Sequence, residues 1–260
     1  MLMTPRYLIS SSYGNDSVAL IQWARELMLQ DVAVIYADTQ WASDAWKERV
    51  TKCEAWVARC GFTPLRAESE GFKSLVRRKK SFPRQGMQFC TQTLKIEAIS
   101  KLAASLDPLG LATVLIGVRR EESARRAAAP LFEISNIPND GRRVIRPLAL
   151  HTAAERDLLL HRAGFSPLPH RSDECYPCIN ANRADLRRLA SDEDRVQEIA
   201  AFENDMGVSS NGAPRTMFRP YRYMGATGIR DIIRWAQSER GDFSLDDGAG
   251  KPCEEEACGL

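Results

Sequence analysis

The sequence has few histidines and no apolar run of about 18 residues, the length that a membrane-spanning helix needs. Its opening, MLMTPRYLISSS, lacks the long apolar segment of a secretory signal. The three histidines stand in no pattern typical of a general base. A net charge of +2 is too small to indicate a polyanionic partner by itself. We therefore expect a cytoplasmic protein without a membrane partner, whose chemistry comes from side chains other than histidine.

Seven cysteines are present, and their number and setting argue against a disulfide framework. The count is odd and no export signal is seen, so the thiols are expected to stay reduced. Cys53 and Cys60 fall on one face of an expected helix and are interpreted as packed thiols. Cys175 and Cys178, in the segment CYPC, form a two-thiolate clip in a proline-rich stretch. Such spacing suits zinc or an iron–sulfur cluster and does not distinguish between them.

Short apolar runs alternate with amphipathic segments through the first half of the chain. Four apolar runs predict buried strands, at residues 6–10, 32–38, 62–68 and 112–118. Segments with helical spacing lie between them, at residues 16–30, 43–61 and 93–106. This alternation predicts an α/β fold, Rossmann-like, with a parallel sheet and helices on both faces. In such sheets ligands bind at the carboxyl ends of the strands.

The second half of the chain is helical and charged. Helices are expected at residues 151–164, 183–207 and 228–239, and the second of these is either one long helix or two pieces. Residues 70–92 are basic, are broken by proline and glycine, and are expected to form a loop. The last 20 or so residues have the composition of a tail, which we expect to be mobile.

The segment SSYGNDS at residues 11–17 lies between the first expected strand and the first expected helix. A turn there exposes backbone N–H groups, and the helix dipole adds partial positive charge, so the turn can hold phosphate. The segment fits neither the dinucleotide-binding pattern nor the P-loop pattern. It fits S-x-G-x-D-S instead, and an ordinary capped turn is the alternative. The candidate phosphate-binding residues are Ser10, Ser12, Gly14, Asp16 and Ser17.

Two more polar segments follow expected strands. YADTQW closes the second strand, where Asp38 and Thr39 are either ligand-binding or a helix-capping pair. GVRREESARR follows the fourth strand, and arginine holds phosphate or sulfate through two hydrogen bonds while staying charged. A solvated basic helix is the alternative. The candidate anion-binding residues here are Gly117, Arg119, Arg120, Ser123 and Arg125.

Together these segments resemble the adenine nucleotide alpha-hydrolase superfamily. Within it they are similar to the phosphoadenylyl-sulfate (PAPS) and adenylyl-sulfate (APS) reductase family, over residues 8–180 and the extreme C-terminus. The resemblance implies that residues 11–17 bind an adenine nucleotide, which is ATP, PAPS or APS, and that Mg²⁺ is needed if ATP is the substrate. It implies that Asp38 and Thr39 lie beside the adenosine. A nucleotide-binding domain is then expected over residues 1–165, and a Cys-cluster and helical region over residues 166–260.

The resemblance also implies a cofactor and a nucleophile. Adenylyl-sulfate reductases hold a [4Fe–4S] cluster, and Cys90, Cys175 and Cys178 match three of its ligands; zinc is the alternative metal. Cys253 is the expected fourth ligand. The terminal ACGL resembles the reductase C-terminus, whose cysteine attacks sulfur, so Cys258 is the expected catalytic nucleophile and a thioredoxin-like reductant the expected partner. The roles of Cys253 and Cys258 can also be exchanged.

Two catalytic branches of this superfamily stay open, and a third possibility keeps the nucleotide fold without catalysis. A sulfonucleotide reductase fits the terminal ACGL. An ATP-pyrophosphatase-type sulfurtransferase that modifies DNA or RNA fits Asp16, Thr91 and Leu94, since DNA phosphorothioation sulfurtransferases share the pattern at residues 90–95. A non-catalytic nucleic-acid-binding protein is the third possibility; its basic surface would be residues 77–80, Arg183, Arg187 and Arg188. A homo-oligomer is compatible with each.

Overall fold

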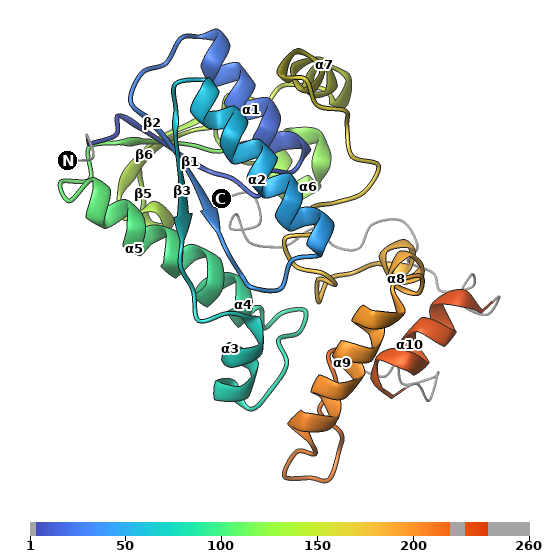
Figure 1. The fold of residues 1–260 in the computed structure, drawn as a ribbon. Coiled ribbons are helices and arrows are strands. Elements are labelled where there is room, and N and C mark those ends of the chain that lie inside the picture. Colours follow the sequence, from blue (N-terminus) through green and yellow to red (C-terminus); the bar gives the residue numbers. More distant parts are fainter. Residues whose placement is uncertain (1–3, 219–226, 239–260) are drawn as a thin grey trace. The chain divides into compact units, whose positions relative to one another are not determined.

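The computed structural model describes residues 4–218 and 227–238, and a six-stranded sheet is its framework (Figure 1). The strands are β1 (Tyr7–Ser10), β2 (Val32–Ala37), β3 (Thr63–Ala67), β4 (Thr113–Leu115), β5 (Phe132–Asn136) and β6 (Arg142–Ile145). Their order is β3-β2-β1-β4-β6-β5, and every neighbouring pair is parallel except β5 with β6. The predicted α/β fold with a mostly parallel sheet is therefore confirmed. The antiparallel β5 and its neighbour β6 were not predicted.

Helices cover both faces of the sheet, and each face has its own apolar core (Figure 1). α1 (Asn15–Glu26), α2 (Asp44–Arg59) and α7 (Ala153–Ala163) pack on one face. α5 (Glu97–Leu106) packs on the other. All of β2 is buried because both of its faces are covered, which explains its unbroken apolar sequence VAVIYA.

The helix ends follow the capping residues of the sequence. Ser43 precedes α2 and accepts a hydrogen bond from the Trp46 N–H at 3.2 Å. Gly61 follows the end of α2 with a φ of +83°, a conformation that favours glycine. α7 is also capped by a side chain. α1 differs, because its N-cap residue Gly14 offers no side-chain acceptor, so the N–H groups of its first turn have no side-chain cap.

Residues 70–92, which were expected to form a loop, contain helix α3 (Phe72–Lys79). Phe72, Leu75 and Val76 form a buried apolar stripe at helical spacing. The basic residues between and after them hide this stripe in the sequence, and for that reason the loop prediction was wrong here.

The expected helix over residues 183–207 is two helices, α8 (Arg183–Leu189) and α9 (Glu193–Met206). Asp192 starts the second by accepting a hydrogen bond from the Arg195 N–H at 3.1 Å. None of the helices among the described residues combines the length and the apolar character needed to cross a membrane. The other short elements are α4 (Phe89–Thr91), the π-helix η1 (Gln92–Ile96), the 3-10 helices η2 (Arg120–Glu122) and η3 (Ile137–Asn139), α6 (Ala124–Ala127) and α10 (Gly228–Gln237).

The chain forms two compact units, which divide it at other places than the expected boundary after residue 165. The segment 166–175 belongs with the sheet, because its hydrogen bonds go to the loops after β1 and β2. Helix α3 belongs with the C-terminal helices. Among described residues, unit 1 holds residues 4–71 and 91–175, and unit 2 holds residues 72–90, 176–218 and 227–238.

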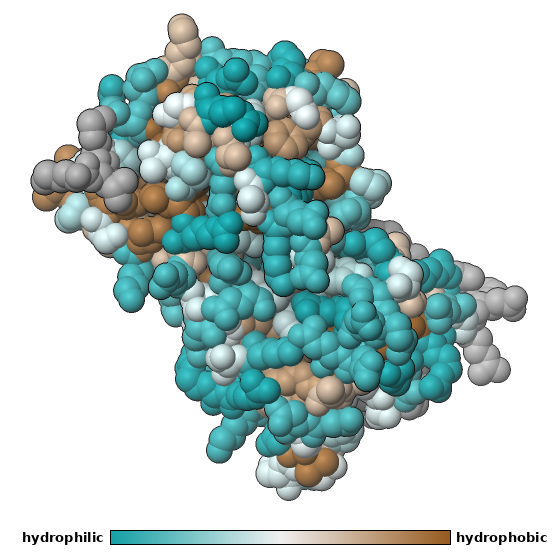
Figure 2. Space-filling view, viewed as in Figure 1, coloured by the Kyte–Doolittle hydropathy of each residue, from teal (hydrophilic) through white to brown (hydrophobic). Residues whose placement is uncertain are grey.

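β5 closes one side of the sheet with exposed apolar side chains. Phe132, Ile134 and the following Ile137 are all exposed. Figure 2 shows apolar atoms gathered at the side of unit 1 where β5 and α5 lie, on a face that is otherwise mostly polar. The apolar residues of β5 thus contribute to the surface, unlike those of β1, β2 and β4.

Charged side chains in unit 2 hold both ends of α10. At its start, the buried Glu203 carboxylate accepts hydrogen bonds from the Met217 and Ile229 N–H groups, both at 2.8 Å. At its end, Arg183 and Arg187 donate to the Ala236 carbonyl oxygen at 3.0 and 2.8 Å. Two of the arginines considered for nucleic-acid contact, Arg183 and Arg187, thus stabilise a helix end.

We predict that Glu203→Gln destabilises the protein more at about pH 4.5 than at about pH 7.5. Burial raises the pKa of Glu203 in the folded protein, although its two backbone hydrogen bonds lower it. The folded state therefore binds the proton more tightly than the unfolded state, and the stability gained from this is lost as the pH rises through the raised pKa. Gln does not titrate. Thermal unfolding of both proteins at the two pH values tests this, with the exposed Glu68→Gln as control; an equal loss at both pH values would contradict it.

Candidate functional site

The carboxyl ends of β1 and β4 lie side by side where the strand order reverses. The chain runs from β1 outward to β2 and β3, whereas β4, β6 and β5 lie on the other side. A crevice outside the strand ends at such a point is where open α/β sheets bind ligands. The two anion-binding segments predicted from the sequence, residues 11–17 and 117–125, begin there.

Residues 11–14 turn the chain from β1 into α1. Ser12 Oγ accepts a hydrogen bond from the Gly14 N–H at 3.3 Å and lies 3.3 Å from Ser17 Oγ. Tyr13 between them has a φ of 58°, in the left-handed region. The hydroxyl groups of Ser12 and Ser17 are thus engaged in contacts within the turn and the first turn of α1. They leave the first-turn N–H groups of α1 without a side-chain cap.

An ion pair joins this turn to the segment after β4. Arg119 Nε donates to Asp16 Oδ1 at 2.5 Å, across 103 positions of sequence. Arg119 also pairs with Glu121. Burial lowers the pKa of the Arg119 guanidinium, but the hydrogen bond and charge of Asp16 raise it more, so the pKa lies above its ordinary value. The sequence predicted that Arg119 binds an anion directly, whereas its partners in this structure are carboxylates.

Gly117 allows the two segments to approach closely. A Cβ atom on Gly117 would lie 3.1 Å from the carbonyl oxygen of Asp16 and 3.6 Å from Leu20 Cβ. The neighbour at 3.1 Å is backbone, which cannot rotate away. Any larger residue must therefore push the first turn of α1 away from β4.

The other candidate residues of this segment have different surroundings. Ser123 Oγ accepts from the Arg126 N–H at 3.2 Å and so caps α6. Arg120 donates to the Ala129 carbonyl oxygen at 3.4 Å, while its buried Nε has no partner within the described residues. Arg125 lies in α6, and its side chain is outside the described part of the structure. Arg120 therefore keeps a guanidinium donor that a ligand could use.

Asp38 and Thr39 follow β2 and contact protein groups. Asp38 Oδ1 accepts from the Gln40 N–H at 2.8 Å. Thr39 is fully buried and donates to the Glu174 carbonyl oxygen at 2.7 Å, and its hydroxyl lies 3.7 Å from Cys175 Sγ. These contacts tie the loop after β2 to the segment that ends at Cys175. Contact of either residue with adenosine stays a prediction.

A buried ion pair holds the segment that ends at Cys175. Lys95 Nζ lies 2.5 Å from Glu174 Oε1, and both side chains are nine-tenths buried or close to it, with exposed fractions of 10% and 9%. Burial raises the pKa of nearby Tyr36, and the Glu174 charge raises it further. Removing one partner from such a pair would leave an uncompensated buried charge.

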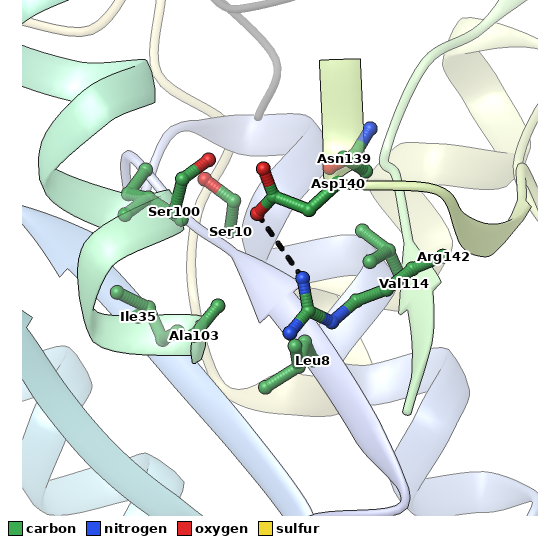
Figure 3. Close-up of a pocket in the computed structure, with 10 residues that line it drawn as sticks. Leu8, Ser10, Ile35, Ser100, Ala103, Val114, Asn139, Asp140 and Arg142 are labelled. Carbon is green, nitrogen blue, oxygen red and sulfur yellow. Dashed lines mark hydrogen bonds and ion pairs between the residues drawn. The ribbon is translucent and has the colours of Figure 1, made fainter. Parts of the chain in front are cut away.

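Ser10 lies apart from the other residues predicted to bind phosphate. Side chains alternate along β1, so Ser10 shares the α5 face of the sheet with Leu8, on the side away from α1. Its Oγ is buried and has no partner within the described residues. Ser10 lines a pocket with Asp140 and Arg142, which are joined at 3.1 Å (Figure 3). The Ser10 side chain therefore points away from the face of the sheet on which α1 lies, and the structure does not place it with the side chains of the 11–17 turn.

The cysteines predicted to bind a metal are distributed over different parts of the chain. Cys175 belongs to unit 1, whereas Cys90 and Cys178 belong to unit 2; Cys253 and Cys258 lie outside the described residues. Within residues 4–218 and 227–238, no three His, Cys, Asp or Glu side chains are grouped as a metal site requires. The cluster thus stays a prediction.

Cys53 is a buried thiol, and burial raises its pKa to about 12. Such a thiol stays protonated and unreactive near neutral pH. Its interpretation as a packing residue agrees with this, and Cys60 is partly buried on the same helix face.

Two residues that position the 11–17 turn were not predicted. Asn15 exchanges hydrogen bonds with the Leu168 backbone, at 3.0 Å to its carbonyl oxygen and 2.9 Å from its N–H. Arg49 Nε donates to the Tyr13 carbonyl oxygen at 2.8 Å. Asn15 occupies a variable position of the S-x-G-x-D-S pattern, Arg49 belongs to no motif, and their partners lie 153 and 36 positions away.

A family model described as the phosphoadenosine phosphosulfate reductase domain matches residues 6–169, more than half of the chain. The chain belongs to this family. The match spans both anion-binding segments and the whole sheet. Family membership supports an enzyme of the adenine nucleotide alpha-hydrolase type and leaves the reaction open.

One curated relative is an uncharacterized 37.8 kDa protein of Escherichia phage 186, 26% identical over 202 residues. The alignment covers 70% of this chain and 60% of the relative, so the chain spans less than two thirds of that protein's length.

Two solved structures are weakly similar. A phosphoadenylyl-sulfate (PAPS) reductase from Candida auris, in a phosphate complex, is 16% identical, with a TM-score of 0.47 and coverage of 63% of this chain and 75% of that one. An NH3-dependent NAD synthetase from Campylobacter jejuni, with nitrate bound, is 14% identical, with a TM-score of 0.42 and coverage of 79% and 85%. The family assignment rests on the match over residues 6–169.

We predict that Gly117→Ala destabilises the protein by about 1–3 kcal/mol, the usual cost of overpacking. It should also weaken nucleotide binding, because the added methyl group displaces the Asp16 backbone. Denaturant unfolding and calorimetric titration measure the two effects. Gly61→Ala is the control: it meets no atom within 4 Å, so its strained φ should cost about 1–2 kcal/mol without changing nucleotide binding. Unchanged binding by Gly117→Ala would contradict the prediction.

Proposed function

We propose that this chain is an enzyme that binds an adenine nucleotide at residues 11–17 and carries out chemistry on sulfur. The observation that carries the proposal is the uncapped N-terminus of α1, with Asp16 in its first turn and Arg119 beside it at the strand reversal. Oriented N–H groups and the helix dipole favour a phosphate group at such a place. Membership of the phosphoadenosine phosphosulfate reductase domain family supports the same conclusion.

Asp16 favours ATP as the nucleotide. A carboxylate beside a phosphate group repels it unless a cation lies between them, and Mg²⁺ commonly bridges carboxylates and the phosphates of ATP. The Asp16 side chain is 26% exposed, and its Oδ1 is the atom bonded to Arg119. When bound, Mg²⁺ would neutralise charge on the pyrophosphate. PAPS and APS carry no β,γ-pyrophosphate and give Asp16 no such role, so they are the alternative substrates.

The sulfur step differs between the two branches. In the ATP-using branch, an oxygen of the acceptor, which is DNA or RNA in this proposal, attacks the α-phosphorus of ATP and pyrophosphate leaves. A sulfide-level donor, hydrosulfide, then attacks the adenylated atom of the acceptor, the bond to the AMP oxygen breaks, and AMP leaves. In the reductase branch, the Cys258 thiolate attacks the sulfur of PAPS or APS, and the bond from that sulfur to the nucleotide oxygen breaks. A thioredoxin-like dithiol then becomes a disulfide as sulfite leaves.

We predict that protein purified without oxygen releases pyrophosphate from ATP–Mg²⁺, faster with DNA or RNA present. Asp16→Asn should lower this rate by about 100-fold or more, the size expected for losing a charge aligned with the reacting phosphates. Asp44→Asn, which changes an exposed carboxylate in the first turn of α2, should not. Parallel assays measure sulfite from PAPS and APS. Sulfite release that needs Cys258, without pyrophosphate release, would refute the ATP-using branch in favour of the reductase.

We also propose that Cys90, Cys175, Cys178 and Cys253 bind a [4Fe–4S] cluster. Since Cys253 lies outside the described residues, no step of the proposed reaction is routed through this site. Protein purified without oxygen should be brown, and Cys175→Ser or Cys178→Ser should lose most of the colour and iron. Cys60→Ser, at a partly buried thiol directly after α2, should keep both. A colourless protein with one zinc ion would refute the cluster.

A further inference from the structure

Arg49 of α2 lies behind the turn that leads into α1. Its guanidinium carbon is 5.5 Å from the ring centre of Trp46 and 5.4 Å from that of Phe165. Its Nε donates a hydrogen bond to the Tyr13 carbonyl oxygen at 2.8 Å. Two aromatic rings and one hydrogen bond therefore restrict its position and direction.

The Tyr13 carbonyl group that Arg49 contacts belongs to the peptide that leads into α1. The Tyr13 carbonyl and the Gly14 N–H belong to one planar peptide and point in opposite directions. Holding the oxygen therefore also directs the N–H of the α1 N-cap residue, which lies against Ser12 Oγ at 3.3 Å. Tyr13 has a φ of 58° and a fully buried side chain stacked 5.8 Å from Tyr36, so the turn has little freedom to rearrange.

The charge of Arg49 is not balanced by a carboxylate within the described residues. Arg119 pairs with Asp16, and Arg66 pairs with Glu54 at 2.7 Å. Arg49 forms no ion pair with a carboxylate among the described residues. Its Nη2 atom is buried and has no hydrogen-bond partner there. Burial lowers the pKa of this guanidinium. Arg49 is partly buried, so its charge is partly desolvated without a counter-charge, and a bound anion would compensate it.

We propose that Arg49 is a positioning residue for nucleotide binding, which holds the Tyr13–Gly14 peptide in place and adds an uncompensated positive charge behind the phosphate-binding turn. The inference rests on the proposed binding of an adenine nucleotide at residues 11–17. Arg49 acts through the turn and touches no ligand itself. Its charge favours ligands in proportion to the negative charge that they bring to the turn.

Calorimetric titrations with ATP–Mg²⁺, AMP and adenosine test this inference. Arg49→Gln keeps an N–H donor and removes the charge, Arg49→Lys keeps the charge, and Lys52→Gln removes a charge from an exposed position of the same helix. We expect Arg49→Gln to weaken ATP binding about 10-fold, equivalent to about 1.4 kcal/mol, with a smaller loss for AMP and under 2-fold for adenosine. Arg49→Lys should recover much of the loss for ATP, and Lys52→Gln should bind as the wild type does.

The outcomes separate the inference from the proposed function. Equal losses for ATP and adenosine, together with a lower unfolding temperature, would show a merely structural role and overturn the inference. Unchanged ATP binding by Arg49→Gln would overturn it as well, while leaving the proposed function intact. A wild-type protein that binds neither ATP nor PAPS nor APS would overturn the proposed function, and the inference with it.

Discussion

The ion pair between Asp16 and Arg119 is the contact on which the arrangement of the site depends. It joins the first turn of α1 to the segment after β4, two places that are adjacent in the sheet but 103 positions apart in sequence. Gly117 makes the contact possible by leaving the space that a side chain would fill. If the pair were broken, Arg119 would lose its main counter-charge at a nearly buried position, which costs several kcal/mol. The two segments therefore take their positions together.

The buried and partly buried cations of unit 1 considered above fall into two groups with different consequences. Arg119, Lys95 and Arg142 each lie against a carboxylate, so they hold elements together and add little net field. Arg49 has aromatic rings and a carbonyl oxygen around it instead. Arg49 therefore leaves its positive charge without a carboxylate partner behind the turn at residues 11–14, where the dipole of α1 also points its positive end.

The sequence predicted the strands and helices whose apolar residues or capping residues mark them clearly. β2 is apolar throughout because both of its faces are covered, and Ser43 marks the start of α2. β5 and β6 escaped prediction because FEISN and RRVI are short and half polar. The motif residues were found, but not their partners. That Ser10 faces α5, or that Thr39 donates to a carbonyl 135 positions away, depends on strand register and tertiary packing, which a single sequence does not encode locally.

The paired hydrogen bonds between Asn15 and Leu168 have a consequence for the order in which the protein folds. They connect the first turn of α1 to a residue 153 positions later, beyond the last strand and α7. During synthesis the N-terminal strands and helices leave the ribosome well before residue 168, and long-range contacts of this kind form late. The turn at residues 11–14 can therefore reach its final geometry only after nearly all of unit 1 has been made. A chain truncated before residue 168 would contain every residue of that turn and still lack the contact that completes it.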